Sequence, residues 1–229
     1  MDVAKYCAFK MRKLKIMIPT TFGSGSEVTR IAVLKVDNKK KSFHDDGILA
    51  DIAIIDSYFI ENASSEIIKN SAIDACAQCT EAYDSKLANM YTKFLCGTAF
   101  SYLEDGILKN NNEKIVLGSM FTGLGFGNSS TTLGHALSYV FSNEGISHGH
   151  ALAFTTVEAH KFNNSNFSTR FKNLVEKLNF EKISLKQSLE EAADLILADK
   201  KHLDNNPRDI TKEQIISILN QINSGNSID

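Results

Sequence analysis

The sequence has few of the features that mark membrane or nucleic-acid-binding proteins. It contains no tryptophan and only two prolines, which favours a helix-rich chain with little rigid loop. No apolar run approaches the ~20 residues that a membrane-spanning helix needs. The net charge of −2 at pH 7 comes without a basic stripe, so no surface for nucleic acid is indicated. We therefore expect neither a nucleic-acid partner nor a membrane partner.

The cysteines and the first residues of the chain bear on its compartment. The segment MDVAKYCAFKMRKLK is unlike a signal peptide, because its charges are mixed and no apolar region follows at once. The sequence therefore predicts reduced thiols and a cytoplasmic location. Cys76 and Cys79 form a CxxC, which can be a redox pair or half of a zinc site. No second CxxC occurs, and both lie in an apolar stretch of helical type, so we expect them to pack in the core.

The apolar pattern changes near Ser57 and divides the chain in two. Before Ser57 it predicts a helix at Asp2–Met11 and buried strands at Leu14–Ile18 and Ala50–Ile55. Between these strands it predicts a hairpin, in which Ile31–Val36 and Lys41–His44 are joined by a turn at 37–40. After Ser57 it predicts helices at Ile67–Tyr83, Met90–Leu108, Ile115–Phe126, His135–Phe141, Gly149–His160, Phe171–Leu178, Leu185–Lys200 and Ile215–Ile222. We expect an α/β domain over residues 1–57 and an all-α domain over residues 58–229.

Several residues mark where these helices begin and end. Ser64 or Ser65 is a suitable N-cap for the first helix of the all-α domain. Thr211 and Gln214 have the spacing of a capping box before the last helix. The polar tail Asn223–Asp229 is expected to fray.

Three of the six histidines lie within the segment Leu133–Ala151. His135 and His148 are thirteen residues apart, so a turn at 143–145 and a new helix opened by Ser147 are needed to bring them together. Two imidazoles at facing helix ends can hold a divalent cation. Asp74 and Gln78, spaced i, i+4 on one helix face, are the best further ligands. The alternative is that these histidines cap helices, form hydrogen bonds or lie at the surface. His44 and His202 lie in polar surroundings and are expected to face solvent.

A glycine- and serine-rich turn, Thr20–Glu27, follows the first predicted strand. Ligands of α/β sheets bind at the carboxyl ends of strands, and a glycine-rich turn lets backbone N–H groups approach a phosphate. The segment is neither a P-loop nor a GxGxxG fingerprint. A plain strand-to-helix turn is the alternative interpretation.

Several motifs in order carry a family resemblance. PTTFGSGSEVT at Pro19–Thr29 is similar to PTTxGTGSEVT, DACAQCTEAY at Asp74–Tyr83 to DAxxHxxEAY, and SHG at Ser147–Gly149 to PHG. Gly123–Asn128 and the segment Asn206-Pro-Arg stand at matching places. In these motifs the chain resembles the iron-containing (group III) alcohol dehydrogenases. These enzymes pair an α/β nucleotide-binding domain with a helical metal-binding domain, a dehydroquinate synthase-like architecture.

The resemblance implies a metal-dependent, NAD- or NADP-linked alcohol dehydrogenase or aldehyde reductase that acts on a small alcohol or aldehyde. The implied ligands of a divalent ion, Fe²⁺ or Zn²⁺, are Asp74, Gln78, His135 and His148. The residues implied to line the dinucleotide are Thr20, Thr21, Gly23, Ser24 and Lys41. Tyr139 or His150 would relay a proton.

The sequence departs from the family pattern in three places. Asp2–Lys5 resembles the end of GGGSxxDxAK, whose glycines are absent, so we expect the C-terminal portion of an enzyme that a separate N-terminal chain or a homodimer partner completes. Gln78 stands where the family has a histidine ligand, and a carboxamide oxygen is the harder, weaker ligand. Tyr139 stands where many members have a further histidine. The glutamine, with TTLGHALSY and HGHA, resembles the phosphonoacetaldehyde reductases, whose substrate carries an anionic tail.

Two other interpretations stay open at this stage. A non-catalytic remnant would keep the helical fold and a metal but bind no cofactor, and the missing glycines favour it. A lyase of the dehydroquinate-synthase-like group would use NAD transiently. The sequence of the segment PTTFGSGSEVT favours the dehydrogenase over the lyase.

Overall fold

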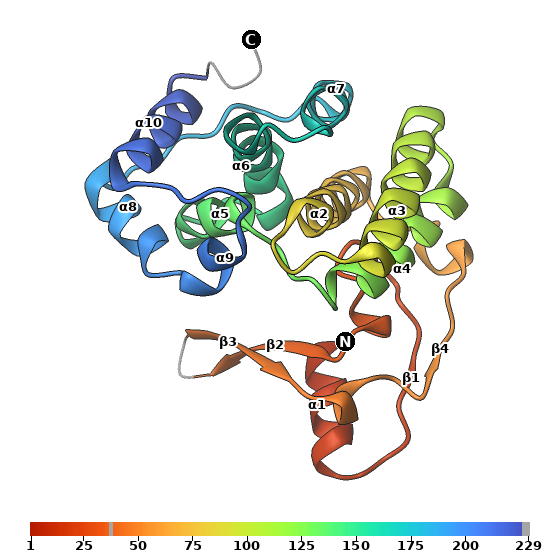
Figure 1. Ribbon diagram of the computed structural model, residues 1–229. Helices are drawn as coiled ribbons and strands as arrows, with labels where there is room; N and C mark the ends of the chain where they lie inside the picture. Colours follow the sequence, from red (N-terminus) through yellow and green to blue (C-terminus); the bar gives the residue numbers. More distant parts are fainter. Residues whose placement is uncertain (37–38, 226–229) are drawn as a thin grey trace.

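The computed structural model describes residues 1–36 and 39–225, and this part of the chain is mostly helical with two small sheets. A body of helices lies above a smaller lobe that holds α1 and the strands (Figure 1). The helices are α1 (Asp2–Lys10), α2 (Ser65–Asp84), α3 (Met90–Lys109), α4 (Asn112–Phe126), α5 (Leu133–Asn143), α6 (His148–Asn163), α7 (Ser168–Leu178), α8 (Leu189–Leu197), α9 (Lys200–Asn205) and α10 (Lys212–Asn223). Among the described residues no helix has the length and apolar character to cross a membrane.

The expected buried strands are short and only partly buried. Of the predicted strand Leu14–Ile18, only Ile16–Met17 (β1) is part of a sheet, and of Ala50–Ile55 only Ile52–Ala53 (β4). The two strands pair in parallel. Ile16 is 48% exposed but Met17 is 8% exposed, so only one side of β1 is buried, and Ile52 is 49% exposed, so the prediction of burial is wrong for β4. In the described part of the chain each strand has a single partner, and burial of a parallel sheet needs further strands and helices on both faces.

The expected hairpin is present. Ile31–Val36 (β2) pairs antiparallel with Lys39–His44 (β3), and Ile31 lies opposite His44. Residues 37–38 of the predicted turn lie outside the described residues. The hairpin reaches beneath α9 (Figure 1), where Lys201 Nζ is 3.3 Å from His44 Nε2. His44 is exposed, as expected.

Helix α2 is the centre of the helical body. It begins where Ser64 Oγ accepts a hydrogen bond from the backbone N–H of Ile67, which confirms the predicted N-cap. Its middle turns are buried on all sides, with α3 and α4 on one flank and α5 and α6 on the other (Figure 1). Cys76 and Cys79 are fully buried there, which confirms their packing role, and burial raises the pKa of both thiols. A helix buried all round is mostly apolar or small in sequence, and the buried Gln78 and Glu81 of α2 are exceptions to this pattern.

The C-terminal segment departs from prediction at one helix. The expected helix Leu185–Lys200 is shorter in the structure, where α8 ends at Leu197 and begins only after Ser188, whose Oγ accepts from the N–H of Glu191. Helix α9 begins at Lys200, the last residue of the predicted range, and was not predicted. The N–H of Leu185 donates to Asn223 Oδ1 at the end of α10, which holds the preceding segment extended. The capping box of Thr211 and Gln214 is present at the start of α10. The expected frayed tail lies partly outside the described residues, at 226–229.

Candidate metal centre

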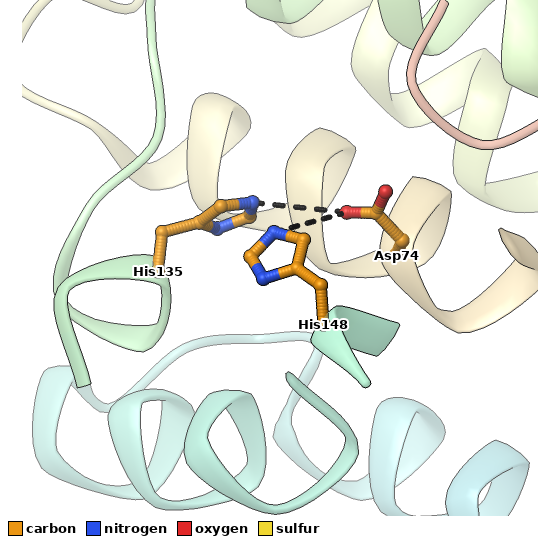
Figure 2. Close-up of side chains that lie close together, drawn as sticks. All are labelled: Asp74, His135 and His148. Atoms are coloured by element: carbon orange, nitrogen blue, oxygen red, sulfur yellow. Dashed lines mark ion pairs between the residues drawn. The ribbon is translucent and has the colours of Figure 1, made fainter. Parts of the chain in front are cut away.

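Three helices bring two imidazoles and a carboxylate to one point. Asp74 comes from the middle of α2, His135 from the first turn of α5, and His148 is the first residue of α6 (Figure 2). Asp74 Oδ1 is 3.8 Å from His135 Nε2 and 3.9 Å from His148 Nε2. One ligand atom from each residue lies within 4.8 Å of the others. Bonds of ~2.1 Å to a shared ion need only a small closure from these distances.

The turn that joins the two histidines is the predicted one. Helix α5 ends at Asn143, the chain turns through Glu144 and Gly145, and Ser147 is the N-cap of α6. Gly145 has a φ of 96°, a left-handed conformation that glycine adopts without steric cost.

The ring of His135 is held by a buried carboxylate. His135 Nδ1 is 2.5 Å from Glu81 Oε2, and Glu81 is buried in α2. Burial alone would lower the pKa of His135, but the neighbouring Glu81 carboxylate more than offsets this and the pKa is raised. Burial alone would raise the pKa of Glu81, but the interaction with His135 outweighs burial, so the pKa of Glu81 is lowered. His135 Nε2 is buried and accepts or donates no hydrogen bond within the described residues, and it faces Asp74.

The ring of His148 is supported from its other side. Its Nδ1 is 3.5 Å from Ser138 Oγ, so its Nε2 is the nitrogen turned toward Asp74. The ring of Tyr139 stacks on His148 with a centroid distance of 6.1 Å and an interplanar angle of 7°. Burial raises the pKa of the Tyr139 phenol. Tyr139 therefore lies beside the candidate metal-ligand set, which we define as Asp74, Gln78, His135 and His148.

The environment of the Gln78 side chain indicates whether Asp74 and its neighbours suit a cation. It is 7% exposed, and its Nε2 donates to Asp74 Oδ1 at 2.9 Å. Its Oε1 is buried and has no hydrogen-bond partner in the described part of the chain. An unsatisfied buried acceptor costs about 1–3 kcal/mol, so a fold that keeps two beside one carboxylate calls for an explanation. A divalent cation bound to Gln78 Oε1 and His135 Nε2 would satisfy both, so the residues present fit such an ion.

His202 corrects a sequence expectation. It was expected to face solvent, but it is 6% exposed, and its Nδ1 is 2.7 Å from Asp199 Oδ2. Its ring stacks near that of His135 at a centroid distance of 6.2 Å. The prediction of exposure relied on the polar residues next to His202 in the sequence. It was wrong because α9 is short and only one of its faces, the one with His202, packs toward α5. The i, i+3 spacing of Asp199 and His202 at a helix start was the available signal.

The two candidate proton-relay residues are placed differently. Tyr139 stacks on His148, as described above. His150 lies two residues beyond His148, which on a helix points it to another face. Its Nε2 is 2.6 Å from the carbonyl oxygen of Glu181, and its ring lies 5.2 Å from that of Phe180. The structure therefore groups Tyr139, and not His150, with the metal-ligand set.

The glycine-serine turn packs against the helical body. Gly23, at a φ of 121°, donates its N–H to Ser119 Oγ of α4 at 2.8 Å, so that N–H is already engaged. The side chains of the other residues expected at the dinucleotide are exposed, namely Thr20, Thr21, Ser24 and Lys41. The turn thus connects the small lobe to the helices that carry the metal-ligand set.

Two family models match the chain. Residues 68–198 match the C-terminal model of the Fe-containing alcohol dehydrogenase family, and residues 1–57 match the iron-containing alcohol dehydrogenase model. A 4-hydroxybutyrate dehydrogenase of Clostridium kluyveri is 36% identical over 157 residues, 62% of this chain and 42% of that protein. A long-chain-alcohol dehydrogenase of Geobacillus thermodenitrificans is 34% identical over 148 residues, 61% of this chain and 38% of that protein. The chain thus spans less than half the length of these relatives.

Solved structures agree on the fold. An iron-containing alcohol dehydrogenase from Thermococcus thioreducens superposes with a TM-score of 0.82 at 24% identity, covering 93% of this chain and 65% of that one. A sulfoacetaldehyde reductase from Bifidobacterium kashiwanohense, solved in complex with NAD+, has a TM-score of 0.83 at 22% identity, with the same two coverages of 93% and 65%.

Proposed function

The chain belongs to the iron-containing alcohol dehydrogenase family, and from that premise we propose that it forms the metal-binding part of a metal-dependent, NAD(P)-linked alcohol dehydrogenase or aldehyde reductase. The observation that carries the proposal is the pair of unpartnered buried acceptors, Gln78 Oε1 and His135 Nε2, beside Asp74. Such a pair only destabilises a domain that binds no ion, so it supports a metal site, and the family membership supports the catalytic role of that site.

The proposed mechanism assigns a role to each side chain near the ion. Bound Fe²⁺ or Zn²⁺ supplies Lewis-acid polarisation of the substrate oxygen, and NAD or NADP supplies the hydride chemistry. Asp74, Gln78, His135 and His148 would hold the ion. The ring of Tyr139 stacks on His148, so its phenol is the group near the ion that would donate a proton in the direction of aldehyde reduction.

The proposed substrate is a small aldehyde or alcohol with an anionic tail. The segments TTLGHALSY and HGHA, with glutamine at position 78, resemble the phosphonoacetaldehyde reductases. The names of two similar proteins point to the same substrate class, because 4-hydroxybutyrate carries a carboxylate and sulfoacetaldehyde a sulfonate. The enzyme would select among small aldehydes by recognising a phosphonate, carboxylate or sulfonate tail.

The proposed dinucleotide site is incomplete without further protein. Thr20, Thr21, Gly23, Ser24 and Lys41 would line the cofactor from the small lobe, which we assign to residues 1–57 as one domain. Isoleucines of β1 and β4 are exposed in the described chain. A parallel sheet of two strands is not stable on its own, so we propose that another α/β segment, as a separate chain or from a second copy, covers it.

Aldehyde-dependent oxidation of NADH or NADPH tests the proposed activity. The chain loaded with Fe²⁺ or Zn²⁺ is assayed at millimolar cofactor, which compensates for weak binding, with Asp74→Ala as the matched control. We expect slow turnover that Asp74→Ala abolishes. Turnover no greater than that of the control would contradict the activity and favour a non-catalytic remnant.

Calorimetry with NAD(H) and NADP(H) tests whether a further segment is needed. We expect dissociation constants weaker than micromolar for the chain alone, because few groups of the small lobe are placed to hold the phosphates. Micromolar binding by this chain alone would show that no further α/β segment is required.

A further inference from the structure

The start of helix α5 lacks a cap of its own. Its N-cap residue, Thr132, makes no side-chain hydrogen bond to the first turn. The first N–H groups of a helix have no partner within the helix, so burial leaves them to be satisfied from elsewhere. Glu81 of α2 accepts from the backbone N–H of Thr132 at 3.2 Å and from that of Gly134, and Asn206 Oδ1 accepts from that of Leu133 at 3.4 Å. A carboxylate also suits the positive end of the helix dipole.

The carboxylate of Glu81 also contacts the side chain of His135, the residue that follows Gly134. Glu81 Oε2 accepts from Thr132 and lies 2.5 Å from His135 Nδ1, while Oε1 accepts from Gly134. An acceptor at Nδ1 places the ring proton on that nitrogen and leaves Nε2 with its lone pair. Nε2 is the nitrogen that faces Asp74. Neutral imidazole in water favours the opposite tautomer, with the proton on Nε2, so the ring needs this acceptor to present a lone pair to an ion.

Position 134 leaves space for this contact only as glycine. A Cβ added to Gly134 would collide with Glu81 Oε1. The close packing of α5 on α2 therefore places Glu81 against the helix start and the ring of His135 at once. Aspartate, shorter by one methylene, would not span both.

We propose that Glu81 is a positioning residue that couples the start of helix α5 to the tautomer of His135, so that one buried carboxylate decides which nitrogen His135 presents to the metal. The proposal rests on the proposed metal centre for its functional meaning. Its structural half concerns the metal-free protein and can be measured without any ion.

Nitrogen-15 NMR of the histidine rings tests the structural half. Spectra of the metal-free protein are recorded at alkaline pH, where the ring is neutral, and His135→Gln identifies the His135 signals. The parent should show the proton on Nδ1, and Glu81→Ala should move it to Nε2. Glu81→Gln is nearly isosteric, and its single amide oxygen should take the place of Oε2, which has two donors against one for Oε1, so the Nδ1–H form should be retained while the hydrogen bond from Gly134 N–H is lost. A Glu81→Ala protein that keeps the parent tautomer would overturn the proposal.

Zn²⁺ affinity, measured by chelator competition, tests the functional half. We expect Glu81→Ala to weaken binding by ~10–100-fold and Glu81→Gln to weaken it less. The matched control is Thr80→Val, on the same helix, which loses the hydrogen bond to His160 at 2.9 Å but is not a partner in any of the three Glu81 contacts. It should lower the melting temperature and leave both tautomer and affinity unchanged. If Glu81→Ala changed only the melting temperature, Glu81 would be a helix cap and nothing more. If the parent bound no Zn²⁺, the proposed function would fail while the tautomer result still decided the role of Glu81.

Discussion

Replacing Gln78 by histidine should tighten the metal site. Position 78 lies one turn after Asp74 on α2, and the Gln78 amide already contacts Asp74 Oδ1 at 2.9 Å. A histidine at this position therefore points at the same ion without backbone movement. Imidazole is a better ligand than a neutral carboxamide for borderline ions such as Fe²⁺ and Zn²⁺.

The size of the gain follows from how such ligand changes act elsewhere. Changes in and around a metal-ligand set shift affinity by ~10–100-fold. At about 1.4 kcal/mol for each factor of ten, this corresponds to about 1.4–2.8 kcal/mol of binding free energy. The substitution also removes the buried, unpartnered Oε1, so the metal-free protein should not be destabilised by the loss of that atom.

Chelator competition with Zn²⁺ on the parent, Gln78→His and Gln78→Met measures the effect. Methionine keeps the volume of glutamine but removes the ligand oxygen, so it should weaken binding where histidine strengthens it. An unchanged or weaker dissociation constant for Gln78→His would refute the reasoning. In that case Gln78 contacts a bound water or the substrate, and three protein ligands hold the ion.

Two further predictions follow from buried groups near the centre. His160 is fully buried and desolvation lowers its pKa from 6.5 to about 4, so the unfolded chain binds more protons and stability should fall by about 3 kcal/mol as the pH drops from 6.5 to 4. Urea unfolding of the metal-free protein across this range checks it, and an equally steep loss in His160→Gln would contradict the assignment. A Cβ at Gly149 would collide with the carbonyl group of Asn70, so Gly149→Ala should cost about 1–3 kcal/mol and weaken Zn²⁺ binding through the adjacent His148. Its control is Gly97→Ala, where a Cβ meets only an ordinary contact with Tyr83, and equal effects of the two substitutions on Zn²⁺ affinity would count against the close approach of α6 to α2.

Local signals in the sequence predicted much of the helical body. Ser64 and the pair Thr211–Gln214 mark helix starts because capping is a contact between residues close in the chain. Ser147 is also an N-cap residue as predicted, although its Oγ donates to Asn70 Oδ1 and not to the first turn of α6. The spacing of Asp74 and Gln78 placed them on one face for the same reason, and the Gln78–Asp74 hydrogen bond confirms that arrangement.

What the sequence did not predict depends on contacts between distant segments. The role of Glu81 requires knowing that α2 packs against the start of α5, which no local pattern states. The burial of His202 likewise depends on where α9 turns its face. Ile16 and Ile52 have the apolar character of buried strands, yet burial requires further strands and helices that the described chain does not place there.

The most direct test of the account is the metal content of the purified chain. Elemental mass spectrometry is applied to the parent, Asp74→Ala and His148→Ala after equal loading with Fe²⁺ or Zn²⁺ and removal of free metal. The account predicts about one ion per parent chain and a large loss in both variants, because each removes a charged or imidazole ligand from a set of four. Variants that hold as much metal as the parent would contradict the assignment of the site.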